Sequence, residues 1–375
     1  MLKYHMQGFS GYNVQYSPYF DNKLAVASAS NYGLVGNGRL SILDIAPNGQ
    51  LIETKSFLTQ DCLFDIAWNE QHEKQVVVAQ GDGSLRLFDI DLAKYPIAIF
   101  NEHKKEVMSC NWNLINKTMF TSSSWDGTVK IWSPTRKESL LTLRPTPKWK
   151  KHLDSMEPII PKRRNNIQIQ PSHKINMPNN NNNKDCIYQS QFSPHDPNLL
   201  ICCSGDSYTT IFDLRDPYNT QRNFLSHAGM EVLSADFNKY RPNVLATAGV
   251  DNSIRIWDFR MLVARDAAIC INEIVNAHDL AVRKVVWSPH HSDILLSTSY
   301  DMSCKIWNDL SYDPIQQRKT GKTNSLDFTG NGCRFIMNQH TEFVFGADWS
   351  MWGQPGYVAS TGWDGNVFIW NGLRG

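Results

Sequence analysis

One pattern recurs seven times along the chain and constrains the possible folds more than any other feature. In its clearest copy, His103 is followed by Trp112, by the turn Trp125-Asp126-Gly127 and by Trp132. Every copy keeps a turn Asp or Asn and, six residues later, a large apolar residue. These pairs are Asn37 with Leu43, Asp82 with Phe88, Asp126 with Trp132, Asp206 with Phe212, Asp251 with Trp257, Asp301 with Trp307 and Asp364 with Trp370. A repeat of about 45 residues built from short alternating runs is typical of a β-propeller blade.

Within each copy, alternating apolar runs are separated by turn residues, which predicts short β-strands. One blade cannot bury both of its faces, so we expect the blades to stack around a central channel. The last copy ends soon after its third strand, whereas residues 2–7 precede the inner strand of the first copy. We expect this N-terminal strand to pair with the last blade, because that pairing leaves no open gap in the ring. The sequence therefore predicts an all-β, seven-bladed WD-repeat β-propeller that forms one domain over residues 1–375.

Two connections are longer than the repeat requires. The separation of successive turn residues increases between Asp126 and Asp206 and again between Asp301 and Asp364. The first excess is rich in Asn and basic residues, and such composition predicts a mobile insertion at about 134–184. A second insertion is expected at about 309–335. The basic residues between 148 and 164 could contact RNA or a membrane, but a solvated loop is the favoured interpretation.

Composition and charge argue against several classes of protein. The formal net charge is +1, which gives no overall attraction to nucleic acid or to an anionic membrane. No apolar run approaches the roughly 18 residues of a membrane-spanning helix, and no apolar segment follows the N-terminal residues as in a secretory signal. The eight cysteines show neither framework nor metal-ligand spacing. We expect a cytoplasmic protein with no metal, no other cofactor, no bound nucleic acid and no direct membrane insertion.

Four copies combine Ser or Thr, His and Asp, the residue types of a hydrolase triad. The sets are Ser122, His103 and Asp126; Thr247, His227 and Asp251; Ser297, His278 and Asp301; and Ser360, His340 and Asp364. An active site is needed once, whereas these sets recur with the large Trp of each copy. The recurrence favours a buried hydrogen-bond network that stiffens each blade. We therefore expect that the protein is not an enzyme.

Loops at one rim of the channel are the expected binding surface, because loops on a rigid scaffold usually carry function. Two positions in each copy point toward this rim, one just before the inner strand and one just before the turn Asp or Asn. Nine residues at or beside these positions form the candidate peptide-binding site: Asp61, Glu106, Asp185, Glu231, Glu342, Trp125, Tyr300, Trp363 and Phe343. The five carboxylates favour a cationic ligand, and the interleaved aromatic rings add apolar and cation–π contacts. These residues predict an Arg- or Lys-bearing peptide, whose apolar anchors a helix would present on one face. The alternative is a rim that is polar only because loops contact water.

Several segments resemble one particular family. The residues Gly11 to Tyr19 and Asn31 to Gly38 resemble the first blade of the receptors for the type 2 peroxisomal targeting signal (peroxin seven), and Asp61 to Trp68 is similar to their second blade. Agreement continues at Glu102 to Val107, Trp125 to Gly127, Ser299 to Asp301 and His340 to Phe343. The resemblance covers essentially the whole chain. The Asn run and the long insertion depart from shorter members and resemble a fungal version.

This resemblance implies a function. Such receptors bind an N-terminal signal, Arg/Lys-Leu-(five residues)-His/Gln-Leu, on cargo such as 3-ketoacyl-CoA thiolase in the cytosol. They act with a co-receptor peroxin and dock at membrane peroxins of the peroxisome, which implies shuttling between the two. Under this interpretation Asp61, Glu106 and Asp185 are expected to bind the basic residue of the signal. The rings of Trp125, Tyr300 and Trp363 are expected to contact its apolar residues.

Three other interpretations remain open. A chromatin-associated propeller could bind a basic histone tail through the same acidic rim. A substrate receptor of a ubiquitin ligase would need a recruitment motif, which the sequence does not show. A propeller enzyme would need one catalytic cluster that is not repeated, or a metal site.

Overall fold

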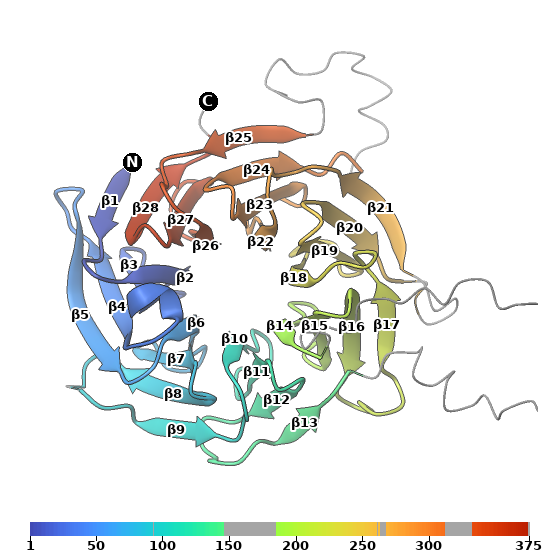
Figure 1. Cartoon of the computed structure of the whole chain (residues 1–375), viewed down its shortest axis with the longest axis horizontal. Coiled ribbons are helices and arrows are strands. Elements are labelled where there is room, and N and C mark those ends of the chain that lie inside the picture. Colours follow the sequence, from blue (N-terminus) through green and yellow to red (C-terminus); the bar gives the residue numbers. More distant parts are fainter. Residues whose placement is uncertain (93, 146–184, 261, 263–267, 312–331, 374–375) are drawn as a thin grey trace, which may run out of the picture.

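The computed structural model describes residues 1–92, 94–145, 185–260, 262, 268–311 and 332–373. It arranges them as seven four-stranded antiparallel sheets around a common centre (Figure 1). The predicted seven-bladed, all-β propeller is confirmed. Short runs of β-branched and apolar residues, separated by Gly, Asp and Asn turns, form the strands, as expected for pleated, half-buried segments.

The strands follow one order in each blade, from the inner strand at the centre to the outer strand at the periphery. Blade 1 consists of β2 (Ser10–Tyr16), β3 (Lys23–Ala29), β4 (Gly38–Ile45) and β5 (Leu51–Thr59), with the short 3-10 helix η1 (Ser30–Gly33) between β3 and β4. Blade 2 consists of β6 (Leu63–Trp68), β7 (Gln75–Gln80), β8 (Ser84–Asp89) and β9 (Ala98–Asn101). Blade 3 consists of β10 (Val107–Trp112), β11 (Phe120–Ser124), β12 (Val129–Trp132) and β13 (Leu141–Leu143). Blade 4 consists of β14 (Ile187–Phe192), β15 (Leu199–Ser204), β16 (Tyr208–Asp213) and β17 (Arg222–Leu225).

The remaining blades repeat this order. Blade 5 consists of β18 (Val232–Phe237), β19 (Val244–Gly249), β20 (Ile254–Asp258) and β21 (Ile269–Ile274). Blade 6 consists of β22 (Val282–Trp287), β23 (Ile294–Ser299), β24 (Cys304–Asn308) and β25 (Cys333–Met337). Blade 7 consists of β26 (Val344–Trp349), β27 (Tyr357–Gly362) and β28 (Asn366–Asn371), and its outer strand is β1 (Leu2–His5).

The ring closes as the sequence predicts. Strand β1 pairs antiparallel with β28, with Leu2 opposite Ile369 and His5 opposite Asn366. Figure 1 shows β1 lying beside β28 at the outer edge of the last blade. Because both ends of the propeller meet in one sheet, the blade has its full complement of four strands and no unpaired third strand is exposed.

The His, Asp and Ser or Thr sets are buried hydrogen-bond chains. In blade 3, His103 Nδ1 lies 3.0 Å from Asp126 Oδ2 and its Nε2 lies 2.7 Å from Ser122 Oγ. The indole of Trp132 donates to the same Ser122 Oγ at 2.8 Å. Blades 5, 6 and 7 repeat the arrangement with Trp257, Trp307 and Trp370 as donors. The predicted blade network is therefore present in four blades. In each of them it joins the turn Asp, through the His, to the second and third strands of the sheet.

Both predicted insertions contain an outer strand. Strand β13 lies within 134–184, and β25 begins within 309–335. Such short strands carry too few alternating residues to be recognised from the sequence alone. Residues 146–184 and 312–331 lie outside the described part of the chain, so the mobility of the two insertions stays a prediction. None of the eight cysteines forms a disulfide bond. No helix among the described residues has the length and apolar character needed to cross a bilayer.

Candidate functional site

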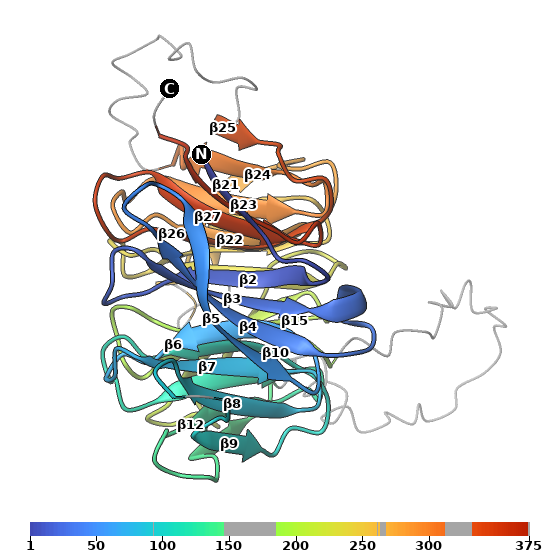
Figure 2. The ribbon, with the colours of Figure 1, turned by 90° about the vertical axis from the view of Figure 1, so that its left-hand side faces the viewer.

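One face of the ring carries both sets of predicted rim positions. In six blades a backbone hydrogen bond joins a residue near the start of the inner strand to the residue before the turn Asp. Examples are Trp125 N to Glu106 O at 3.1 Å, Tyr300 N to Ala281 O at 3.2 Å and Trp363 N to Phe343 O at 2.9 Å. The turn that positions the Asp for its His thus also brings the two predicted positions together. We call this face the mouth of the channel. The helix η1, which lies in the same connection between β3 and β4 as the turn residue Asn37, is on this face in Figure 2.

The five predicted carboxylates are spread over five blades. Asp61, Glu106, Asp185, Glu231 and Glu342 precede the inner strands of blades 2, 3, 4, 5 and 7. Asp61 accepts the amide of Cys62 at 2.7 Å, and Glu231 accepts the hydroxyl of Tyr188 at 2.8 Å. Of the described residues, none donates a hydrogen bond to the side chain of Glu106 or Glu342. At least these two carboxylates can therefore accept donors from a ligand.

Two buried thiols, Cys62 and Cys186, lie near these carboxylates. Burial raises the pKa of Cys62 to about 12, and the hydrogen bond and charge of Asp61 add to this increase. Burial also raises the pKa of Cys186, where the charge of Lys105 acts against the charges of Glu231, Asp185 and Glu106. Carboxylates of three successive blades, 3, 4 and 5, therefore lie around the Cys186 thiol, together with the cation of Lys105.

Three of the four predicted aromatic residues form one cluster. The ring of Phe343 lies 5.1 Å from Tyr300 and 5.3 Å from Trp363, between ring centroids. Trp363 stacks on Phe345 at 5.0 Å and also contacts Tyr32 at 5.3 Å. This cluster covers blades 6, 7 and 1. The fourth predicted aromatic, Trp125, lies apart in blade 3, where its ring meets Tyr188 at 6.2 Å.

The structure also reveals a ring of residues that sequence reasoning missed. Each inner strand contains a β-bulge near its first residue, where the register shifts by one position. The seven bulged residues are Tyr12, Phe64, Met108, Tyr188, Leu233, Arg283 and Phe345. All except Leu233 line a cavity of about 240 Å³ at the centre of the ring, and Leu233 packs against Tyr188. Bulges re-aim side chains at the rims of β-structures, and here they turn six apolar residues and one Arg toward the mouth.

A signal for this bulge ring was present in the sequence. In blades 2 to 5 and in blade 7, the bulged residue is itself apolar and directly follows a buried apolar residue, as Phe64 follows Leu63. Two successive apolar residues interrupt the strict alternation of a half-buried strand. A search for this interruption would have found five of the seven bulged residues, but not Tyr12, which follows Gly11, or Arg283.

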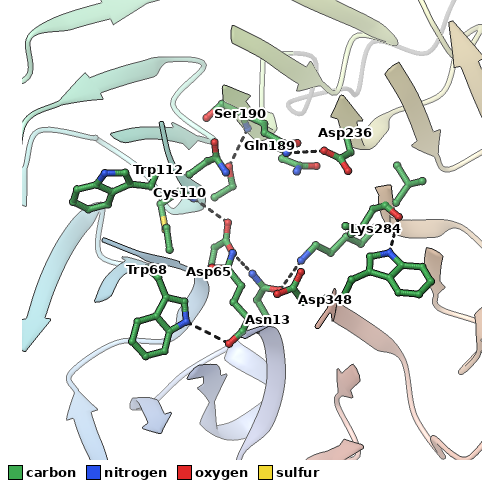
Figure 3. Close-up of a pocket in the computed structure, with 18 of the residues that line it drawn as sticks. Asn13, Asp65, Trp68, Cys110, Trp112, Gln189, Ser190, Asp236, Lys284 and Asp348 are labelled. Carbon is green, nitrogen blue, oxygen red and sulfur yellow. Dashed lines mark hydrogen bonds between the residues drawn. The ribbon is translucent and has the colours of Figure 1, made fainter. Parts of the chain in front are cut away.

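The channel wall below the mouth is polar and internally bonded (Figure 3). The carboxylate of Asp65 accepts a hydrogen bond from the backbone N–H of Cys110 in the next blade at 2.9 Å. It also accepts one from the side-chain amide of Asn13. Lys284 reaches from the other side and donates to Asn13 Oδ1 at 2.7 Å. Burial raises the pKa of Asp65 and lowers that of Lys284, while the attraction between their opposite charges acts against both changes. These groups bind one another, so we assign the wall to structure.

Metal-binding geometry is not found in the described segments, where no three His, Cys, Asp or Glu side chains are grouped to hold an ion. The histidines of the four blade networks are already bonded to an Asp and to a Ser or Thr. The mouth combines carboxylate acceptors, aromatic faces and a shallow apolar ring.

Comparison with known proteins agrees with this geometry. Residues 94–133 and 324–371 match the family described as WD domain, G-beta repeat, and residues 166–307 match the EIPR1 beta-propeller. The chain is 60% identical, over an alignment that covers 100% of both chains, to the peroxisomal targeting signal 2 receptor of Saccharomyces cerevisiae. Identity to the receptor of the same name from Komagataella phaffii is 45%, again over 100% of both chains. For the Mus musculus receptor it is 32%, over 97% of this chain and 94% of the other. The resemblance seen in the sequence is confirmed, and the chain belongs to the family of peroxisomal targeting signal 2 receptors.

Proposed function

We propose that this protein is a cytosolic import receptor that binds the N-terminal type 2 targeting signal of peroxisomal proteins. The cargo class includes 3-ketoacyl-CoA thiolase, and delivery to the peroxisome requires a co-receptor peroxin and docking peroxins at the membrane. The observation that carries the proposal is the 60% identity, over the full length of both chains, to a protein named for that signal. The mouth supplies independent chemical support, since it pairs carboxylates with aromatic rings.

The signal has the chemistry that this mouth would recognise. Its basic residue would bind Asp61, Glu106 and Asp185, with Glu231 and Glu342 extending the negative field. A hydrogen bond between charged groups contributes about 1.5–3 kcal/mol. The leucines of the signal would contact Trp125, Tyr300, Phe343 and Trp363. Aromatic and apolar contacts of this kind favour a helical peptide that presents its apolar residues on one face.

Fluorescence anisotropy of a labelled Arg-Leu-(five residues)-His-Leu peptide tests the proposal. We expect saturable binding, with the co-receptor added if the receptor alone binds weakly. Glu106→Lys should lower the affinity roughly a hundredfold, because an attraction becomes a repulsion. The matched control is Glu138→Lys, which makes the same charge change at an exposed residue in the turn between β12 and β13, on the opposite face.

The outcomes separate the alternatives. Binding that Glu106→Lys abolishes and Glu138→Lys preserves, with unchanged circular dichroism, supports both the receptor function and the acidic mouth. An equal loss of affinity in both variants would show that the effect depends on the net charge of the protein and not on the mouth. No binding even with the co-receptor would overturn the proposal and favour a histone tail or a ubiquitin-ligase substrate as the ligand.

A further inference from the structure

A second cavity lies at the outer edge of the ring, around the blade in which the two ends of the propeller meet. Its volume is about 880 Å³, against about 240 Å³ for the cavity at the centre. Figure 1 shows β1, β28 and β25 at this edge, close to the N-terminus. We call it the seam cleft, and its boundaries include Tyr16 and Asp21 of blade 1, Leu2 and Trp370 of blade 7, and Ile336 of blade 6.

Apolar and aromatic side chains form most of the lining of the seam cleft. Phe335 of β25 stacks on Trp370 of β28 with 5.3 Å between ring centroids, and both line the cleft. Trp352 also lines it and is fixed by its indole, which donates to the carbonyl of Ser17 at 2.9 Å. Ile336 stays 42% exposed. A mostly apolar hollow of about 300–1,000 Å³ is typical of a ligand site, so the cleft has both the size and the lining of one.

The polar side chains of the seam cleft are almost all uncharged. They include the amides of Asn338, Gln339, Gln354 and Asn371. Asp21 is the single charged side chain among the described residues that line the cleft. Side-chain amides can donate to and accept from a peptide backbone, whereas a phosphate or another polyanion would meet no cation here. The lining therefore favours a peptide with apolar side chains.

Asp21 adds a charge preference to this lining. The residue is exposed in the connection between β2 and β3. No ion pair or hydrogen bond to its carboxylate is found in the part of the chain that the structure describes. The nearest cation in the sequence, Lys23, is bonded to Asp44 at 2.6 Å. The carboxylate of Asp21 is therefore available to a Lys or Arg that stands beside the apolar residues of a ligand.

We infer that the seam cleft binds a short apolar segment of a partner protein, with a Lys or Arg of that segment paired to Asp21. The apolar residues of the segment cover Ile336, Phe335 and Trp352, and its backbone meets the side-chain amides.

This inference does not depend on the proposed function. Asp21 and Trp352 lie in connections between the first and second strands of their blades, at the opposite end of those strands from the turns of the mouth. The segment and a ligand at the mouth can therefore be bound together.

Two peptides with the same uncharged fluorophore test the charge preference. They are acetyl-Gly-Leu-Phe-Leu-Lys-Gly-amide and the same sequence with Glu in place of Lys. We expect the unaltered protein to bind the Lys peptide about three- to tenfold more tightly, measured by fluorescence anisotropy. Asp21→Lys should invert this ratio. Glu138→Lys is the matched control and should keep it, because Glu138 is exposed on the same face of the ring but in blade 3.

A second pair of variants tests the apolar wall. Ile336→Gln should lower the affinity for both peptides about fivefold, because an apolar contact is lost while the charge is unchanged. The matched control is Ile99→Gln, since Ile99 is 49% exposed on β9, the outer strand of blade 2, and lines neither cavity. This control should bind both peptides as the unaltered protein does. Urea unfolding checks that all four variants are folded.

Several outcomes would overturn the inference. One is the absence of saturable binding of either peptide, and another is a ratio that Asp21→Lys leaves unchanged. Displacement of the peptides by an excess of the Arg-Leu-(five residues)-His-Leu peptide would place them at the mouth instead. Binding to neutral phosphatidylcholine vesicles that Ile336→Gln weakens, without binding of the peptides, would replace the partner protein by a bilayer. None of these outcomes changes the binding of the targeting signal itself, so the proposed function is tested separately.

Discussion

Carboxylates stand both on the wall and at the mouth of the central channel, but their surroundings differ. On the wall, Asp65, Asp236 and Asp348 each accept a backbone amide of the following blade, at distances of 2.7–2.9 Å. Two lysines, Lys239 and Lys284, lie among them. At the mouth, Glu106 and Glu342 accept no hydrogen bond from the described residues. The same chemical group therefore holds blades together in one region and remains available to a ligand in the other.

The comparison teaches that the partners of an acidic residue, rather than its presence, indicate its role. A buried carboxylate that accepts an amide from the next blade satisfies a donor that would otherwise be orphaned. A carboxylate at the mouth has water as its alternative partner and loses little when a ligand replaces that water. Wall substitutions should consequently change folding stability, and mouth substitutions should change affinity.

The largest effect is expected from Asp65→Ala on the wall. This change leaves the Cys110 amide without its acceptor and removes a charge that stabilises Lys284, so the free energy of unfolding should fall by about 3–5 kcal/mol. Urea unfolding monitored by tryptophan fluorescence measures it. Asp65→Asn is the control, because its carbonyl oxygen can still accept the amide and should recover part of the loss. An Asp65→Ala protein as stable as the unaltered one would remove the distinction between wall and mouth.

A smaller effect, on peptide affinity rather than on folding stability, is expected from Glu342→Gln at the mouth. We expect the affinity for the Arg-Leu-(five residues)-His-Leu peptide to fall about tenfold, which corresponds to about 1.4 kcal/mol. The free energy of unfolding should stay within about 0.5 kcal/mol, since no described hydrogen bond is lost. Anisotropy and urea unfolding of the same preparation give both values. Loss of stability without loss of affinity would assign Glu342 to the scaffold.

The smallest effect is a pH dependence that arises on the wall. Burial raises the pKa of Asp348 to about 6, although the charge of Lys284 and the amides of Tyr16 and Trp349 lower it. The folded protein therefore binds more protons at this residue than the unfolded chain between about pH 4 and 6. The contribution of Asp348 to the free energy of unfolding should thus decline as the pH rises through this window.

Asp348→Asn should remove this part of the decline. The measurement is urea unfolding of both proteins at pH 4.5 and pH 7, because other groups titrate identically and cancel in the difference. The blade networks act in the opposite sense. Burial acts to raise the pKa of Asp364, but the hydrogen bond and charge of His340 and the bonds from Asn366 lower it to about 2. A steeper decline in Asp348→Asn than in the unaltered protein would contradict the assignment.

Local patterns predicted the scaffold well. The turn Asp and the large apolar residue six positions later predicted all seven blades, and the four His-containing sets were correctly interpreted as buried networks. The pairing of β1 with β28 followed from counting strands in the last copy. The outer strands β13 and β25 were not recognised, because their few residues show no period that distinguishes them from loops.

The mouth was predicted in part. The sequence placed the nine candidate residues at equivalent positions of the repeat, and the backbone bonds at six blades bring these positions together. It described carboxylates and aromatic rings as interleaved, whereas the structure gathers Tyr300, Phe343 and Trp363 over blades 6, 7 and 1 and leaves Trp125 beside Tyr188. Arg283 escaped notice because it lies two residues beyond Ala281, the position considered in its blade, and the bulge turns it toward the cavity.

The sequence by itself determined the number of blades, the order of their strands and the residues of the blade networks. These properties depend on turns and alternation within one repeat, and hydrogen bonding between neighbouring segments is sufficient to specify them. Only the tertiary structure decided which residues of different blades face one another. The gathering of Tyr300, Phe343 and Trp363 into one cluster, and the bonding of Asp65 to the following blade, depend on closing seven sheets into a ring. The facing of residues from different blades is a property of packing between segments that are distant in sequence, and no local pattern encodes it.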